Sequence, residues 1–186
     1  YTVTYTDANF DASTLTAANV TLNPTGTANG TVSLTGSGLS YTVTISSITG
    51  EGTLGLAIAG GTATDRAGNA AASATSATFT VDNTAPAVTI GAPSSSLARG
   101  GPITYTVTYA DTNFDTSTLT AANVSLNQTG AANGTVSVSG SGTSYTVTVS
   151  GITGDGTLGI SIAAGTATDS SGNSAQASGA SATFAV

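Results

Sequence analysis

Apolar and polar residues alternate with a period of two along short segments of this chain. Residues 1–5 read Tyr-Thr-Val-Thr-Tyr, and residues 41–45, 105–109 and 145–149 repeat this arrangement of tyrosine or aliphatic residues with threonine. Successive side chains of a β-strand point to opposite faces of the sheet, so each segment would present one apolar and one hydroxyl-bearing face. The pattern predicts half-buried β-strands, and no segment shows the 3.6-residue stripe of an amphipathic helix.

Glycine, asparagine and serine separate these segments at short intervals. The pairs Asn29-Gly30 and Asn133-Gly134 are strong hairpin signals, because both central residues of a type I′ turn need positive φ. The Leu-Thr-Ala-Ala-Asn stretches at residues 15–19 and 119–123 are expected to form at most a short turn. Together these features predict an all-β protein made of two-sheet antiparallel sandwiches, immunoglobulin-like (Ig-like) in outline, with about seven strands per copy.

The chain repeats itself at an offset of 104 residues, because the sequence that begins at Tyr1 begins again at Tyr105. A repeat of about 100 residues is the size of one small domain rather than of a solenoid turn. We therefore expect two tandem Ig-like domains. The first, at residues 1–81, would lack its N-terminal strand, and the second, at residues 82–186, would consist of a linker and a complete copy.

The complete copy allows strands and a core to be assigned. Strands are expected at residues 87–90, 103–109, 124–127, 135–138, 144–149, 157–163 and 182–186. The expected core comprises Tyr105, Val107, Tyr109, Phe114, Leu119, Leu126, Val136, Tyr145, Val147, Val149, Ile152, Leu158, Ile160, Ile162 and Phe184. A domain of this size buries about two-thirds of its unfolded surface, which is enough for it to fold alone.

The composition restricts the chemistry that the chain can perform. Charged residues make up 6% of the sequence, against roughly a quarter in an ordinary globular domain, and lysine, histidine, cysteine, methionine and tryptophan are absent. Without histidine, cysteine or lysine there is no ordinary general base near neutral pH, no thiolate nucleophile and no Schiff base. We therefore expect the protein not to be an enzyme.

The charge balance bears on partners and location. The net charge is −7, with Arg66 and Arg99 as the positive residues, which disfavours nucleic acid and anionic lipid as partners. No stretch approaches the 18 apolar residues of a membrane-spanning helix, so membrane insertion is not expected. An extracellular or cell-surface location fits these properties best.

The acidic residues are expected to gather at one end of the second copy. In a sandwich, loops after the second and sixth strands return to the end where the domain began, which places Asp111, Asp115 and Asp169 beside the linker that carries Asp82 and Asn83. The same argument directs Glu51 of the first copy toward this junction. Up to five carboxylates would converge there, and the equivalents in the first copy are Asp7, Asp11 and Asp65.

Calcium is the natural counterion for such a cluster, because it takes six to eight hard oxygen ligands in flexible geometry. Residues 111–115 have the Asp-x-Asn-x-Asp spacing that opens many calcium loops, although Thr116 and Ala122 replace the glycine and glutamate of an EF-hand. The alternative is that aspartate and asparagine only stabilise turns through bonds from their side chains to the backbone. The sequence leaves both interpretations open.

Three motifs resemble those of the bacterial Ig-like repeats found in tandem in large secreted adhesins and surface proteins. They are Tyr-Thr-Val-Thr-Tyr followed by Asp-x-Asn-Phe, the Asp-Asn-Thr-Ala-Pro linker at residues 82–86, and the Thr-Ala-Thr-Asp-x-x-Gly-Asn loops at residues 62–69 and 166–173. The resemblance covers both copies. It implies a role as a stalk, with structural Ca²⁺ at domain junctions bound by Asp82, Asp111 and Asp169, and less securely by Asp115.

We therefore expect a non-catalytic structural repeat of an extracellular adhesin stalk or surface fibre, with adjacent repeats or neighbouring subunits as partners. A second hypothesis starts from the strand expected to be absent before Tyr1. Either the chain is part of a longer array, or a neighbouring subunit donates that strand and builds a self-assembling filament. A third hypothesis is an adhesive module that itself binds glycan or protein, although aromatic residues are scarce and mostly assigned to the core.

Overall fold

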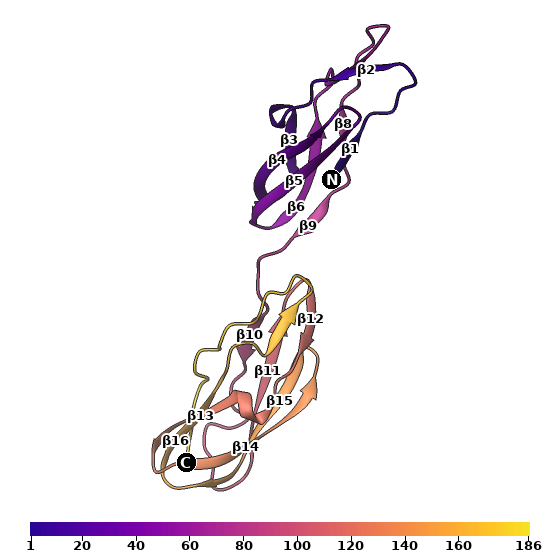
Figure 1. The fold of residues 1–186 in the computed structure, drawn as a ribbon. Coiled ribbons are helices and arrows are strands. Elements are labelled where there is room, and N and C mark those ends of the chain that lie inside the picture. Colours follow the sequence, from indigo (N-terminus) through magenta and orange to yellow (C-terminus); the bar gives the residue numbers. More distant parts are fainter. The chain divides into compact units, whose positions relative to one another are not determined.

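The computed structural model describes residues 1–186 and consists of β-strands and short turns (Figure 1). The chain divides into two compact units, unit 1 at Tyr1–Asn83 and unit 2 at Thr84–Val186. Its helical content is limited to two three-residue 3₁₀ turns, and no helix is long and apolar enough to cross a membrane. The expectation of an all-β, antiparallel protein is confirmed.

Unit 1 contains nine short strands. They are β1 (Thr2–Thr4), β2 (Phe10–Ser13), β3 (Val20–Pro24), β4 (Asn29–Ser37), β5 (Ser40–Thr49), β6 (Gly52–Ile58), β7 (Ala63–Asp65), β8 (Ala74–Thr75) and β9 (Phe79–Val81), with the 3₁₀ turn η1 at Ala17–Asn19. One sheet has the order β1-β5-β4, so β1 is an edge strand. The other has the order β3-β6-β8, with β9 also paired to β6, while β2 pairs with β7.

Unit 2 also has nine strands and repeats this arrangement, except that β10 is added and β8 has no counterpart. Its strands are β10 (Ala87–Ile90), β11 (Ile103–Ala110), β12 (Phe114–Ser117), β13 (Val124–Gly130), β14 (Asn133–Ser141), β15 (Ser144–Thr153), β16 (Gly156–Ile162), β17 (Ala167–Asp169) and β18 (Phe184–Ala185), with η2 at Ala121–Asn123. The sheets are β10-β11-β15-β14 and β13-β16-β18, and β12 pairs with β17. The added strand is β10, which covers the edge that β1 leaves open in unit 1.

The core of unit 2 lies between its two larger sheets. Side chains from β11 and β15 on one sheet form a single apolar cluster with side chains from β16 and β18 on the other. Twelve of the expected core residues are buried there, and Phe114, Leu126 and Val136 pack against the cluster. Each fully buried aliphatic or aromatic side chain contributes about 1.5–3 kcal/mol, so this cluster supplies most of the driving force for folding.

The asparagine-glycine pairs are not at turns, and this expectation is wrong. Asn29 and Gly30 begin β4, while the hairpin between β4 and β5 turns at Gly38 and Leu39, with Gly38 at a φ of +65°. Glycine at the first central position is the type II′ preference. Gly30 is instead a point of close approach, because a β-carbon there would lie 2.7 Å from Cγ2 of Ile45.

Ser47 is the only residue other than glycine with positive φ, at +50°. It lies in β5 opposite an irregularity of β4, and its counterpart in β15 is Gly151 at +58°. A left-handed conformation costs an L-residue about 1–2 kcal/mol, whereas glycine adopts it freely.

We expect Ser47→Gly to stabilise unit 1 by about 0.5–1 kcal/mol, because removal of the backbone strain exceeds the added entropy of the unfolded chain. Amide exchange at Val43, a buried residue of β5, would report the free energy of opening. Gly151→Ser is the matched reverse change and should destabilise unit 2. An unchanged or faster exchange in Ser47→Gly would contradict the strain.

Candidate metal centre

Two neighbouring chain segments bring Asp111 and Asp169 together in unit 2. Asp111 directly follows β11, and Asp169 is the last residue of β17. Strand β12 begins three residues after Asp111 and pairs with β17, with Phe114 opposite Asp169. The backbone N–H of Ser170 also donates to the carbonyl of Asn113 at 2.8 Å. The two loops are thus fixed to each other by backbone bonds.

A buried tyrosine holds the base of these loops. The hydroxyl of Tyr109, two residues before Asp111, is 2.7 Å from Oγ1 of Thr166, three residues before Asp169. Both side chains are buried, and burial raises the pKa of Tyr109 despite the bond to Thr166. An unpaired buried hydroxyl would cost about 1–3 kcal/mol, so this bond strongly favours one arrangement of the two strand ends.

The carboxylate of Asp169 accepts hydrogen bonds from its own turn, although only 3% of the residue is exposed. Oδ1 accepts the backbone N–H groups of Ser171 and Asn173 at 2.9 and 2.8 Å, and Oδ2 accepts Nδ2 of Asn173 at 2.7 Å. Burial is the largest single influence and raises the pKa of Asp169, but the bonds from Asn173, Ser171 and Gly172 together lower the pKa below its usual value. Asp169 is therefore held as an anion.

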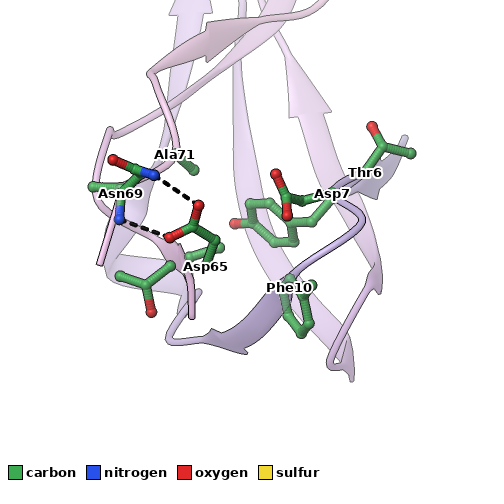
Figure 2. Close-up of a pocket in the computed structure, with 10 residues that line it drawn as sticks. Thr6, Asp7, Phe10, Asp65, Asn69 and Ala71 are labelled. Atoms are coloured by element: carbon green, nitrogen blue, oxygen red, sulfur yellow. Dashed lines mark hydrogen bonds between the residues drawn. The ribbon is translucent and has the colours of Figure 1, made fainter. Parts of the chain in front are cut away.

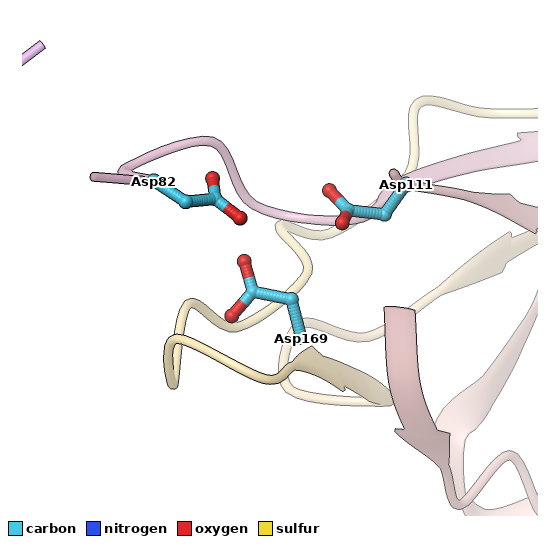
Figure 3. A group of neighbouring side chains, drawn as sticks. All are labelled: Asp82, Asp111 and Asp169. Atoms are coloured by element: carbon cyan, nitrogen blue, oxygen red, sulfur yellow. The ribbon is translucent and has the colours of Figure 1, made fainter. Parts of the chain in front are cut away.

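Asp82, Asp111 and Asp169 form a cluster in which one carboxylate oxygen from each residue lies within 4.8 Å of the others (Figure 3). Asp82 directly follows β9, near the end of unit 1. Figure 3 shows the three carboxylates pointing toward a common centre. Two oxygens bound to one calcium ion at about 2.4 Å lie at most about 4.8 Å apart, so the spacing suits a shared cation.

The donor chemistry of this cluster also fits a hard cation. Each side chain offers anionic oxygen, and an ionised carboxylate has about four lone-pair sites, so Asp169 keeps acceptor capacity beyond its three turn bonds. Three carboxylates at this spacing repel one another unless a cation or protons neutralise them. The residues present therefore fit Ca²⁺, and they include no nitrogen or sulfur ligand that would favour zinc.

The other expected ligands of the junction lie outside this cluster. Asp115 is an exposed residue of β12. Glu51 belongs to unit 1, where its Oε1 accepts the backbone N–H of Asn83 at 2.8 Å, and Nδ2 of Asn83 donates to the carbonyl of Gly50 at 2.7 Å. Glu51 and Asn83 thus fix the end of unit 1 directly after β9.

Unit 1 contains a matching pair of acidic loops around a small open pocket of about 160 Å³ (Figure 2). Asp65 repeats the turn of Asp169, because its Oδ1 accepts the N–H groups of Ala67 and Asn69, and its Oδ2 accepts Nδ2 of Asn69. Asp7 also lines the pocket and accepts the N–H of Asn9 at 2.6 Å, while Asp11 is exposed in β2. The turn bonds therefore form in both units, whereas the cluster of three carboxylates is formed around Asp111 and Asp169 and not around Asp7 and Asp65.

Sequence reasoning missed Asn173, Tyr109 and Thr166 as supports of the site. The signal for Asn173 was present, because an aspartate followed four residues later by asparagine, with glycine between them, occurs in both copies. Gly172 and Gly68 both have positive φ, at 88° and 86°. This conformation lets each turn fold back so that its N–H groups point at the carboxylate of Asp169 or Asp65. Tyr109 was assigned only an apolar role.

We expect Asn69→Ala to raise the pKa of Asp65 toward its usual value, because the side-chain bond from Asn69 is the largest cause of its lowered pKa. A lowered folded-state pKa stabilises the protein above the unfolded-state pKa, and this contribution disappears as the pH falls through the folded-state pKa. The variant should therefore lose stability at neutral pH and differ less from the parent in acid.

An NMR titration of the carboxyl carbons would measure this shift directly. Asp169 in the same variant is the internal control, because its partner Asn173 is unchanged. An unchanged titration of Asp65 would contradict the role assigned to Asn69.

Comparisons of this chain with known protein families, with curated proteins and with solved structures found no match. The assignment of a role therefore depends on the geometry of the two units and on the cluster of Asp82, Asp111 and Asp169.

Proposed function

We propose that this chain is a non-catalytic structural repeat of an extracellular adhesin stalk or surface fibre, built from Ig-like sandwiches and stiffened by Ca²⁺. The observation that carries the proposal is the cluster of Asp82, Asp111 and Asp169, in which a connecting segment and two loops each contribute one carboxylate. The bacterial Ig-like resemblance of the linker and loop motifs supports the same role. The partners would be adjacent repeats of the same kind.

The proposed metal acts on the connecting segment. Asp111 and Asp169 are fixed by strand pairing, by the Tyr109–Thr166 bond and by turn bonds before any ion arrives. Asp82 lies between Val81, the last residue of β9, and Asn83, which is bonded to Glu51 and Gly50, so it is carried by the end of unit 1. An ion bound to all three carboxylates would tie this segment to unit 2 and restrict its motion.

Composition supports a structural rather than a catalytic role. The chain has no histidine, cysteine or lysine, and its nine carboxylates either belong to turns and strand ends or are exposed. A stalk needs a stable fold, a repeated length and limited flexing, and it needs no substrate cleft. The duplicated unit and its acidic junction meet these requirements.

We expect millimolar Ca²⁺ to raise the melting temperature of unit 2, because an ion that binds only the folded state stabilises it by about 2.7 kcal/mol at 100 times its dissociation constant. Asp82→Ala should abolish most of this shift without lowering stability in chelator, because Asp82 belongs to neither core cluster. Asp65→Ala is the matched control and should keep the calcium shift. A parent protein whose melting is unchanged by Ca²⁺ would remove the metal from the proposal.

Small-angle scattering separates stiffening from simple binding. In Ca²⁺ the parent should show a narrower distribution of particle dimensions than Asp82→Ala, and chelator should make the two alike. Asp169→Ala should behave as Asp82→Ala does in Ca²⁺, although it also loses the turn bonds to Asn173. Identical scattering of parent and Asp82→Ala in saturating Ca²⁺ would refute stiffening even if the ion binds.

A further inference from the structure

Asn29 and Asn133 each precede a glycine whose backbone N–H points at the asparagine's own side chain. In unit 1 the N–H of Gly30 donates to Oδ1 of Asn29 at 2.8 Å. In unit 2 the N–H of Gly134 donates to Oδ1 of Asn133 at 2.7 Å. Both asparagines are exposed and begin a strand, β4 or β14. The two units thus form the same contact independently.

The glycine N–H groups are free for this contact because they face away from the sheet. Strands β4 and β14 are edge strands, paired with β5 and β15 on one side only. The N–H of Tyr109 donates to the carbonyl of Thr143, so odd-numbered residues of β15 bond to β11 and even-numbered residues bond to β14. Their partners in β14 are odd-numbered, which leaves the N–H of Gly134 at the open edge. Gly30 has the same place in β4.

The contact brings together the two atoms of an intramolecular reaction. Cγ of an asparagine is about 1.2 Å from Oδ1, so in both units it lies about 3–3.5 Å from the glycine nitrogen, the separation of a near-attack conformer. Glycine has no side chain to obstruct the approach of its nitrogen. No bond of the ladder has to break before this nitrogen reacts, because its N–H belongs to none.

We propose that Asn29 and Asn133 are sites of deamidation through a cyclic imide, with water as the co-reactant. Hydroxide removes the proton from the glycine nitrogen, the nitrogen attacks Cγ, and the bond from Cγ to Nδ2 breaks. Nδ2 takes a proton from water and leaves as ammonia. Water then opens the five-membered imide. Addition at Cγ breaks the new bond and leaves aspartate, whereas addition at the backbone carbonyl breaks the original peptide bond and leaves isoaspartate.

Asn123 is a matched asparagine with the opposite arrangement. Its Oδ1 accepts the N–H and the hydroxyl of Thr120 at 2.9 and 2.8 Å, so its side chain is turned back along the chain. The N–H of the following residue, Val124, donates to the carbonyl of Ala121 and is not directed at the asparagine. The reaction therefore needs a rearrangement at Asn123 that it does not need at Asn133.

The fold accommodates the two products differently. Aspartate leaves the course of the backbone unchanged. Isoaspartate adds one atom to the backbone directly before the glycine, where space is short: a β-carbon on Gly30 would lie 2.7 Å from Cγ2 of Ile45, and one on Gly134 would lie 2.9 Å from Cγ1 of Val149. The added atom cannot be absorbed by a shift toward the neighbouring strand. Isoaspartate should therefore displace the first residues of β4 or β14.

Each event also adds one negative charge to a chain whose net charge is −7. The new carboxylate lies at an end of the unit that is already acidic. Asn29 is paired with Thr49, two residues before Glu51, and Asn133 is paired with Thr153, two residues before Asp155. The modification does not depend on the proposed Ca²⁺ site, because neither asparagine belongs to the acidic cluster.

The test incubates the folded chain in mildly alkaline buffer and follows it by ion-exchange chromatography and peptide mass spectrometry. Two successively more acidic species should appear. Peptides that contain Asn29 or Asn133 should each gain about 1 Da, at least about tenfold faster than the peptide that contains Asn123. The same chain unfolded in urea sets the time scale. If neither site has changed in the folded chain when the unfolded chain has converted completely, the folded geometry blocks the reaction and the proposal is overturned.

A double variant tests the assignment of the two sites. Asn29→Gln with Asn133→Gln keeps both exposed amides but requires a six-membered ring, so both acidic species should disappear. Acidic species that persist in this variant would assign the charge to other residues and overturn the proposal.

The products can be separated with Asn29→Asp, which has the aspartate product at one site from the start. The isoaspartate fraction of the parent, identified by labelling with an isoaspartyl methyltransferase, should melt at a lower temperature than Asn29→Asp. Equal melting temperatures would contradict the lack of space at Gly30.

Discussion

The hydrogen bond between Tyr109 and Thr166 is the constraint from which the arrangement of unit 2 follows. Tyrosine completes the apolar face of β11, but its hydroxyl cannot be buried without a partner. Thr166 supplies that partner directly before β17, so the packing of β11 also fixes this strand, which ends in Asp169. Tyr5 and Thr62 repeat the bond at 2.8 Å in unit 1. In each unit, one tyrosine hydroxyl therefore couples the packing of the core to the geometry of the acidic loops.

Much of this fold could be predicted from alternation, because strands with one buried face carry their register in the sequence. Residues such as Tyr105, Val107 and Val147 could be assigned to the core for that reason. Strands β12 and β17 could not, because each has three or four residues and their pairing depends on contacts distant in sequence. Gly30 was misassigned because a glycine required by lack of space looks the same in sequence as a glycine required by positive φ.

The residues of the candidate site could likewise be predicted from the sequence only in part. Topology alone could direct Asp111 and Asp169 to the end that faces Asp82, because strand parity determines which loops share an end. It could not separate Asp115 from these residues, because whether a side chain at a strand start points inward depends on a register irregularity between Phe114 and Thr116. Nor could it identify Asn173, whose role arises from a turn that returns two N–H groups and an amide to one carboxylate. Local side-chain direction was the missing information.

The parallel pairing of residues 96–98 with β18 has a mechanical consequence for unit 2. Ala98 donates its N–H to the carbonyl of Ala185, and Ala185 donates to the carbonyl of Ser96, both at 2.9 Å. Because the two segments run in the same direction, a force that pulls the two ends of the unit apart slides one along the other. These bonds are then loaded in shear and resist together, whereas a perpendicular force would open them one at a time. The strand that closes the core is thus also the one best placed to bear tension along the chain.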